Sequence, residues 1–175
     1  MRKILLLITI GIFSSCEFKV QSGKIADNSL KMESSEIQNK FPEKNGFVND
    51  FENVFTSEQI NILEKTVNDY ENKLGREIYI ITTANTYGFE NYDKLMSAFF
   101  QNWNVGKLPE QNGLIILMSK ENRKFAITAG LEAQNYLTDE KINKVIGMNV
   151  IPKLKKNDFY AGTKSAVEEM IKLWK

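Results

Sequence analysis

EIYIITTA, residues 77–84, and LIILMS, residues 114–119, are the two stretches that decide the fold. Both are apolar or β-branched at nearly every position, whereas a strand with one solvent-facing side alternates apolar and polar residues. A strand of this composition is buried on both faces, so its sheet needs a layer of other structure on each side. The two stretches therefore predict a sheet in the interior of an α/β protein.

Helical periodicity lies on both sides of the first stretch. Thr56 and Gln59 form a capping-box pattern, which begins a helix that Gly75 ends. The apolar residues of this helix repeat at three- and four-residue steps: Ile60, Leu63, Val67, Tyr70 and Leu74. A second helix is expected to bury one wide stripe of side chains: Tyr92, Leu95, Met96, Phe99, Phe100 and Trp103.

The second stretch continues into a hairpin. SKENR, residues 119–123, is a turn pattern, and KFAITA, residues 124–129, is its antiparallel partner. Two helices follow, and Thr138 caps the first of them. The order α-β-α-β-β-α-α predicts a three-layer α/β/α sandwich, in which helices flank both faces of a central mixed sheet. Sites in such a sheet gather in loops at the carboxyl ends of parallel strands.

Composition narrows the chemistry. The 175 residues carry a formal net charge of +1 and include no histidine. The balanced charge gives no electrostatic footprint for nucleic acid, so no nucleic-acid partner is expected. The lack of histidine removes Ser–His and Cys–His catalysis and the commonest neutral metal ligand. Any chemistry must therefore run on carboxylates, lysines, hydroxyls or a bound hard cation.

The N-terminus is typical of a targeting segment. Residues 1–15 have a basic start and a short apolar run, as in a signal peptide. The sequence from Phe13 to Cys16 resembles the cleavage box of bacterial lipoproteins, although Phe13 stands where that pattern usually has Leu. The resemblance implies that Cys16 becomes lipidated and that the protein is extracytoplasmic and anchored to a membrane. An ordinary secretory signal with a chance cysteine is the alternative.

Two regions follow the targeting segment. Residues 16–46 are polar and poor in aromatic residues, which predicts a flexible tether after the lipidated cysteine. Residues 47–175 are expected to form one domain. Near its end, Lys153, Lys155 and Lys156 form a basic group, which fits either a solvated helix end or a contact with anionic lipid or phosphate.

Known catalytic motifs are absent from the sequence, and oxygen ligands in loops remain: Asp50, Asn112, Glu132 and Asp139. Each has a structural alternative. Asp50 could accept hydrogen bonds from its own loop, and Asn112 precedes a glycine as in many turns. Glu132 is an acid in a turn after Gly130, and Asp139 suits the first turn of a helix.

Six short motifs in order resemble the TPM domain family, which includes thylakoid-lumen photosystem-repair proteins and extracytoplasmic bacterial proteins. The match spans roughly residues 47 to 175. The motifs are Val48-Asn49-Asp50, Trp103 to Lys107, Asn112 to Leu117, Arg123-Lys124, Gly130-Leu131-Glu132 and Leu137-Thr138-Asp139.

The resemblance implies an α/β/α sandwich with an acidic site built from loops, which takes a divalent cation in some members. For other members an acid-phosphatase activity is proposed. This chain departs from the family at Gln111, where members tend to have an aspartate. Loss of that carboxylate should weaken a hard-cation site or favour calcium over magnesium, because calcium tolerates irregular geometry.

Two functions remain open at this stage. The first is a membrane-tethered, non-catalytic module that binds a calcium-type cation and aids a membrane-protein complex. The second is a metal-assisted acid phosphatase, with Glu132 or Asp139 as ligand or general base and Lys107 steadying phosphate charge. The first is favoured, because a phosphatase needs a dense carboxylate cluster and Gln111 thins the one available.

Overall fold

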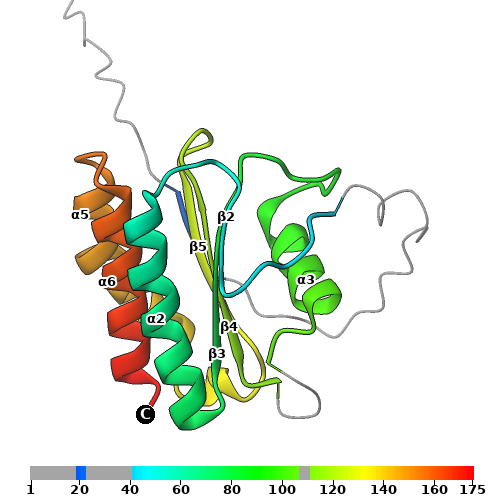
Figure 1. Ribbon diagram of the computed structural model, residues 1–175, viewed down its shortest axis with the longest axis vertical. Helices are drawn as coiled ribbons and strands as arrows, with labels where there is room; N and C mark the ends of the chain where they lie inside the picture. Colours follow the sequence, from blue (N-terminus) through cyan, green and yellow to red (C-terminus); the bar gives the residue numbers. More distant parts are fainter. Residues whose placement is uncertain (1–18, 23–40, 107–110) are drawn as a thin grey trace, which may run out of the picture.

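The computed structural model describes residues 19–22, 41–106 and 111–175. The predicted signal peptide, Cys16 and Lys107 lie outside the described residues. Five strands form one sheet in the order β1-β5-β4-β3-β2, and all neighbours are parallel except β4 and β5 (Figure 1). The strands are β1 (Lys19–Ser22), β2 (Val48–Asp50), β3 (Glu77–Thr82), β4 (Gly113–Ser119) and β5 (Lys124–Ala129).

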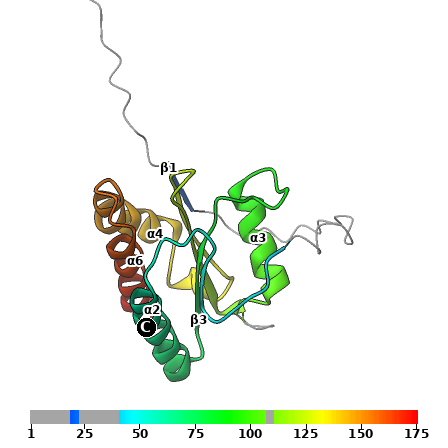
Figure 2. The same ribbon diagram turned by 45° about the horizontal axis from the view of Figure 1, so that its top comes forward.

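Helices cover both faces of this sheet, which confirms the predicted three-layer sandwich (Figures 1 and 2). Among the described helices, one face carries α3 (Tyr92–Trp103). The other carries α2 (Ser57–Leu74), α4 (Asp139–Val145), α5 (Ile151–Leu154) and α6 (Phe159–Leu173). A π-helical turn, Ile146–Val150, joins α4 to α5, and a short 3-10 turn, Ala133–Asn135, precedes α4. Within the described ranges, no helix has the length and hydropathy needed to cross a membrane.

The central strands are buried on both sides, as their composition predicts. All residues of β3 and β4 are buried. Ile78 and Ile80 pack toward α2, whereas Tyr79 and Ile81 alternate with them and pack toward α3. Successive side chains of a strand point to opposite faces, so a strand between two helical layers must be apolar throughout.

The two parallel crossovers have an unusual relationship. The chain moves from β2 to β3 to β4 in one direction along the sheet, through α2 and then α3. These helices lie on opposite faces. Two crossovers that advance in the same direction on opposite faces must have opposite hands, so one of them is left-handed, against the strong general preference.

Residues before position 47 also pack against the sandwich. The ring centroids of Phe41 and Phe99 lie 4.7 Å apart, and Trp103 Nε1 donates to the carbonyl of Pro42 at 2.9 Å. Residues 41 and 42, assigned to the tether from sequence, therefore pack against α3. Residues 19–22, expected within a flexible tether, instead form strand β1 beside β5. The pattern was too short and too polar to predict a strand that is completed by a distant edge.

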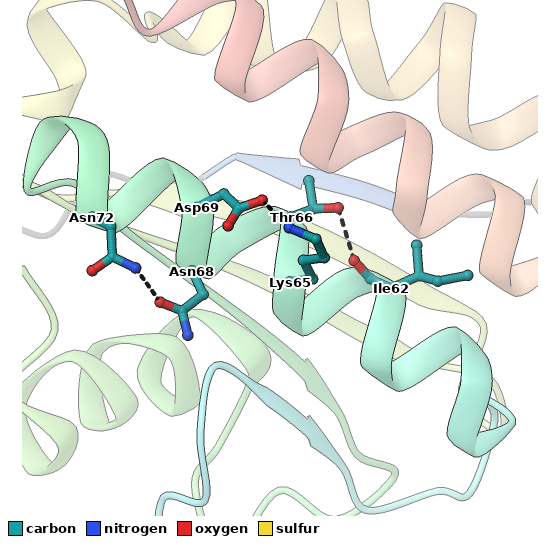
Figure 3. A network of polar contacts seen from close by, with 6 residues as sticks. All are labelled: Ile62, Lys65, Thr66, Asn68, Asp69 and Asn72. Atoms are coloured by element: carbon teal, nitrogen blue, oxygen red, sulfur yellow. Dashed lines mark hydrogen bonds and ion pairs between the residues drawn. The ribbon is translucent and has the colours of Figure 1, made fainter.

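Helix α2 shows which polar residues serve the fold alone. Its predicted capping box is confirmed, with Gln59 N donating to Thr56 Oγ1 and Thr56 N to Gln59 Oε1. On its exposed side, Lys65 pairs with Asp69 at 2.7 Å (Figure 3). Neighbours four residues apart satisfy one another there, so this surface needs no ligand to explain it.

Candidate functional site

The register of the sheet separates the four predicted ligands. Asp50 pairs with Thr82 at the carboxyl end of β3, whereas Glu77 at the other end of β3 pairs with Gly113, next to Asn112. Five residue steps along a strand span about 17 Å. Asp50 and Asn112 therefore cannot hold the same ion. The structure thus places Asp50 apart from Asn112, at the other end of the sheet.

Asp50 instead closes the loop that leads into α2. One carboxylate oxygen accepts from Val54 N at 3.0 Å and the other from Phe55 N at 2.9 Å. The hydroxyl of Thr82 donates to the same carboxylate. These contacts match the alternative raised from sequence, in which Asp50 accepts hydrogen bonds from its own loop.

Asn112 lies at the opposite end, where the chain enters β4. Its Nδ2 donates to the carbonyl of Gly75 at 2.7 Å, and its own carbonyl accepts from Glu77 N at 3.2 Å. Asn112 thus joins the end of α2 to the start of two parallel strands. We call this region, defined by Gly75, Arg76, Asn112 and Glu132, the amino-end junction.

Close backbone packing brings Glu132 to this junction. Gly130 N donates to the carbonyl of Gly113 at 2.8 Å. A Cβ atom at Gly130 would collide with the carbonyl oxygen of Gln111, so only glycine fits here. The glycine at the end of β5 therefore holds the following loop, with Glu132, against the chain that leads into β4.

Arg76 is the member of the junction that sequence reasoning missed. Its guanidinium lies 3.8 Å from Glu132 Oε1 and donates from NH1 to the carbonyl of Trp174 at 2.8 Å. It also stacks over the rings of Tyr136 and Trp174, at 4.9 and 5.2 Å from their centroids. A single arginine after a C-cap glycine carries no local signal, because its partners are distant in sequence.

Tyr70 supports Arg76 from α2. Its hydroxyl donates to the carbonyl of Trp174 that also accepts from Arg76. Burial raises the pKa of Tyr70 above its ordinary value, and the nearby Arg76 partly opposes this rise. Tyr70 and Arg76 thereby hold Trp174, near the C-terminal end of the chain, beside the amino-end junction.

Three buried side-chain atoms at this end lack a hydrogen-bond partner: Asn112 Oδ1, Glu132 Oε2 and Trp174 Nε1. No other described residue has such an atom. Buried polar atoms are nearly always paired with protein, water or a ligand. The two oxygens need donors or a cation, and oxygen atoms of carboxylates and amides are the ligands that calcium prefers.

Asp139 occupies a different position in the same loop region. It is the first residue of α4, next to the N-cap Thr138, whose hydroxyl accepts from Lys141 N. It borders a hollow of about 500 Å³ together with Leu131 and Glu140. A favourable interaction with the helix dipole accounts for an acid at this place.

A dense acidic cluster does not form in the part of the chain that the structure describes. No three His, Cys, Asp or Glu side chains gather there in an arrangement that could hold a metal ion. A cation at the amino-end junction would therefore depend on Asn112 and Glu132, completed by backbone carbonyls and water. Such a donor set fits calcium better than magnesium, which demands a regular octahedron.

The carboxyl ends of the parallel strands form a second hollow, of about 550 Å³. Its lining includes Phe51, Thr83 and Tyr87. Glu52 fixes its rim, because the Glu52 carboxylate accepts from Lys120 N and Glu121 N, both at 3.0 Å. Ligands of parallel sheets usually bind at the carboxyl ends of the strands, which is this end. The candidate ligands Asn112 and Glu132 lie at the opposite end.

The fold and the amino-end junction define a class of protein: an α/β/α domain with a glycine-lined polar junction at one end of its sheet. A family model described as the TPM domain matches residues 48–173. The chain therefore belongs to the TPM domain family, as the six short motifs indicate. Comparison with curated proteins gives no match.

Solved structures share the fold. The N-terminal domain of a protein from P. gingivalis is 18% identical, with a TM-score of 0.65, and the match covers 73% of this chain and 80% of that one. An N-terminal domain from Corynebacterium glutamicum is 17% identical over 78% and 85% of the two chains, with a TM-score of 0.57. The BA42 protein of the psychrophilic bacterium Bizionia argentinensis is 20% identical over 71% and 88%, with a TM-score of 0.58.

Proposed function

We propose that this TPM domain is a non-catalytic binding module that holds a calcium-type cation at its amino-end junction. Asn112 Oδ1 and Glu132 Oε2 would supply the side-chain oxygens. The observation that carries the proposal is that both atoms are buried and without a hydrogen-bond partner. A cation bound in the junction would provide a partner for such oxygens, whereas unpaired burial costs about 1–3 kcal/mol for each group.

Arg76 limits the strength of such a site. Its guanidinium lies 3.8 Å from the other oxygen of Glu132, so it competes for the carboxylate and repels a cation. Gln111 adds no charge to offset this repulsion. We therefore expect a calcium dissociation constant on the order of 10⁻⁴–10⁻³ M, as in extracellular modules, and weaker binding of magnesium.

Calcium titration of residues 17–175 by calorimetry tests the site. Saturable binding is expected, and Glu132→Gln should weaken it at least tenfold, because this change removes the charge and keeps the shape. Glu140→Gln is the matched control: it makes the same change on an exposed acid in the first turn of α4 and should leave binding intact. An absence of saturable binding would reject the proposal, as would binding that Glu132→Gln leaves unchanged.

The alternative function is metal-assisted hydrolysis of phosphomonoesters. The same variants separate it from simple binding. Residues 17–175, assayed with a generic phosphomonoester at acid to neutral pH in calcium or magnesium, should show no turnover. Turnover that Glu132→Gln abolishes and Glu140→Gln preserves would identify a phosphatase.

We further propose that the protein is an extracytoplasmic lipoprotein, tethered to a membrane through Cys16, and that it acts in the assembly of a membrane-protein complex. The support for the anchor is the signal-like segment and the resemblance of residues 13–16 to a lipoprotein cleavage box. Cys16→Ser should move the protein from the membrane fraction to the soluble fraction. Retention in the membrane would count against the anchor.

A further inference from the structure

We infer that the end of the domain that holds the C-terminal ends of β2, β3 and β4 faces an anionic lipid surface. The amino-end junction then points away from the lipid. The inference rests on the lipid attachment proposed at Cys16. It adds an orientation, which follows from the position of β1 in the sheet.

Strand β1 fixes the place where the chain enters the domain. It runs parallel to β5, with Lys19 paired to Lys124 and Ser22 to Ile127. Lys124 pairs in turn with Ser119, the last residue of β4. The start of β1 therefore lies in the same row of the sheet as the carboxyl ends of the parallel strands.

The short spacing between Cys16 and β1 limits the distance to the lipid. Three residue steps reach at most about 11 Å when fully extended. The seven residues of β4 carry the sheet about 23 Å from this end to the amino-end junction. A lipid on Cys16 would hold the near end of the sheet at the bilayer, and the length of the strands would keep the far end away from it.

The near end has a surface suited to anionic lipid. Lys120 lies over the ring of Phe159 at 5.7 Å, which brings the β4–β5 turn beside the start of α6; both lie at the top of Figure 1. The β4–β5 turn, the adjoining start of β5 and the α5–α6 turn carry these described basic side chains: Lys120, Arg123, Lys124, Lys155 and Lys156. Against these, the same end has Glu52, Glu121 and Asp158. The Glu52 carboxylate accepts from Lys120 N and Glu121 N, and Asp158 also caps α6 through Ala161 N.

An apolar side chain completes this surface. Phe51, between β2 and α2, is 40% exposed. Basic residues near an anionic bilayer are attracted to it, and an exposed aromatic ring suits the interface. Sequence alone left Lys153, Lys155 and Lys156 as either a solvated helix end or a lipid contact. Lys155 and Lys156 are therefore assigned to the lipid, whereas Lys153 Nζ donates to the Asn149 carbonyl and Ser165 Oγ.

Depth-dependent quenching tests the orientation. The full chain is produced with its lipid and placed in vesicles of phosphatidylcholine with one-third phosphatidylglycerol. Lipidation consumes the single natural cysteine, so Lys156→Cys and Lys73→Cys each accept one fluorophore, at opposite ends of the domain. A quencher on the lipid headgroup should reduce the signal at position 156 several-fold more than at position 73.

A strand variant tests the cause of the orientation. Replacing Val20 and Gln21 with proline removes two backbone donors from β1, which should detach it from β5 and bring the two quenching values together. Equal quenching without the proline changes would overturn the orientation while leaving the lipid anchor in place. Failure of the chain to bind vesicles would overturn the anchor and the inference together, and an unchanged preference in the proline variant would refute the role of β1.

Discussion

Individual polar residues in this domain divide into those whose bonding is complete and those whose bonding is not. Asp50 uses both carboxylate oxygens on backbone amides and a hydroxyl. Asn112 and Glu132 each leave one buried oxygen without a partner. The three residues look equally suitable as ligands in the sequence, and only the second pair has capacity to bind anything else.

The structural role of Asp50 predicts a loss of stability. Asp50→Ala should lower the free energy of unfolding by about 2–4 kcal/mol, because it leaves Val54 N, Phe55 N and the Thr82 hydroxyl without their charged acceptor. Urea denaturation measures this loss. Asp69→Ala, which removes an exposed ion pair on α2, is the matched control and should cost about 0.5 kcal/mol. Calcium binding by Asp50→Ala at low temperature should match that of the parent chain.

Tyr79 predicts a pH dependence of stability. Burial, followed by the negative charges of Glu77, Glu71 and Glu64, raises the pKa of Tyr79 far above its ordinary value of 10. Above pH 10 the unfolded chain loses this proton while the folded chain keeps it. The unfolded state then binds fewer protons, so the free energy of unfolding falls as pH rises.

Tyr79→Phe removes the titrating hydroxyl and its hydrogen bond from Lys44 Nζ. The variant should be less stable at pH 7 and should lose stability less steeply between pH 9 and 11, as measured by urea denaturation. An unchanged slope in Tyr79→Phe would contradict the assignment.

At the scale of the element, helix ends and strand ends are specified differently. The start of α2 is encoded locally by Thr56 and Gln59. The end of β5 depends on Gly130, which must accept the backbone before β4 at close range. The first can be read from four neighbouring residues, and the second needs the fold.

Two threonines of α2 test the local signal. Thr56→Ala should lower the free energy of unfolding by about 1 kcal/mol, because it removes the N-cap acceptor. Thr66 is bonded only to the carbonyl of Ile62 within the helix (Figure 3). Thr66→Ala should therefore be neutral or slightly stabilising, since alanine is the better helix former. Equal losses would show that the cap contributes nothing specific.

Two glycines test the tertiary signal. Gly130→Ala should destabilise the domain by at least about 2 kcal/mol, because its Cβ would collide with the Gln111 carbonyl. It should also displace Glu132 and weaken calcium binding. Gly147 has open space around it and lies in the helical segment after α4. Gly147→Ala should gain about 0.5–1 kcal/mol in thermal or urea denaturation.

At the scale of the whole molecule, a segment that the sequence pattern assigned to the tether packs against the domain. Phe41 joins the aromatic cluster on α3, and Lys44 donates to the carbonyl of Trp103 at 3.0 Å. Residues before β2 thereby cover the outer helix. Among the described residues the α3 layer contains one helix, and these contacts add to its cover.

Truncation measures that contribution. A chain starting at residue 47 should be less stable than one starting at residue 41 by about 1–3 kcal/mol, because it loses the contacts of the partly buried Phe41 and its neighbours. Near-ultraviolet circular dichroism and urea denaturation report the difference. Trp103 should also lose its partner, the Pro42 carbonyl, and become more accessible to a fluorescence quencher. Equal stability of the two chains would place the boundary at 47.

The sequence by itself determined the layers of this protein. Residues 78–81 and 114–118 are apolar on both faces, and helix signals such as the Thr56 cap and the Gly75 stop lie between and beside them. These signals act over a few residues, so they survive without knowledge of the fold. The sequence also brought Asn112 and Glu132 forward as candidate ligands.

Only the tertiary structure decided which candidates meet. The register of β2, β3 and β4 places Asp50 at one end of the sheet and Asn112 at the other. It also brings Arg76 to Glu132 and sets β1 beside β5, from segments far apart in the chain. Side-chain patterns report which face of an element is buried. Which distant segments meet depends instead on strand order, register and backbone contact. No single residue carries a local signal for these three properties.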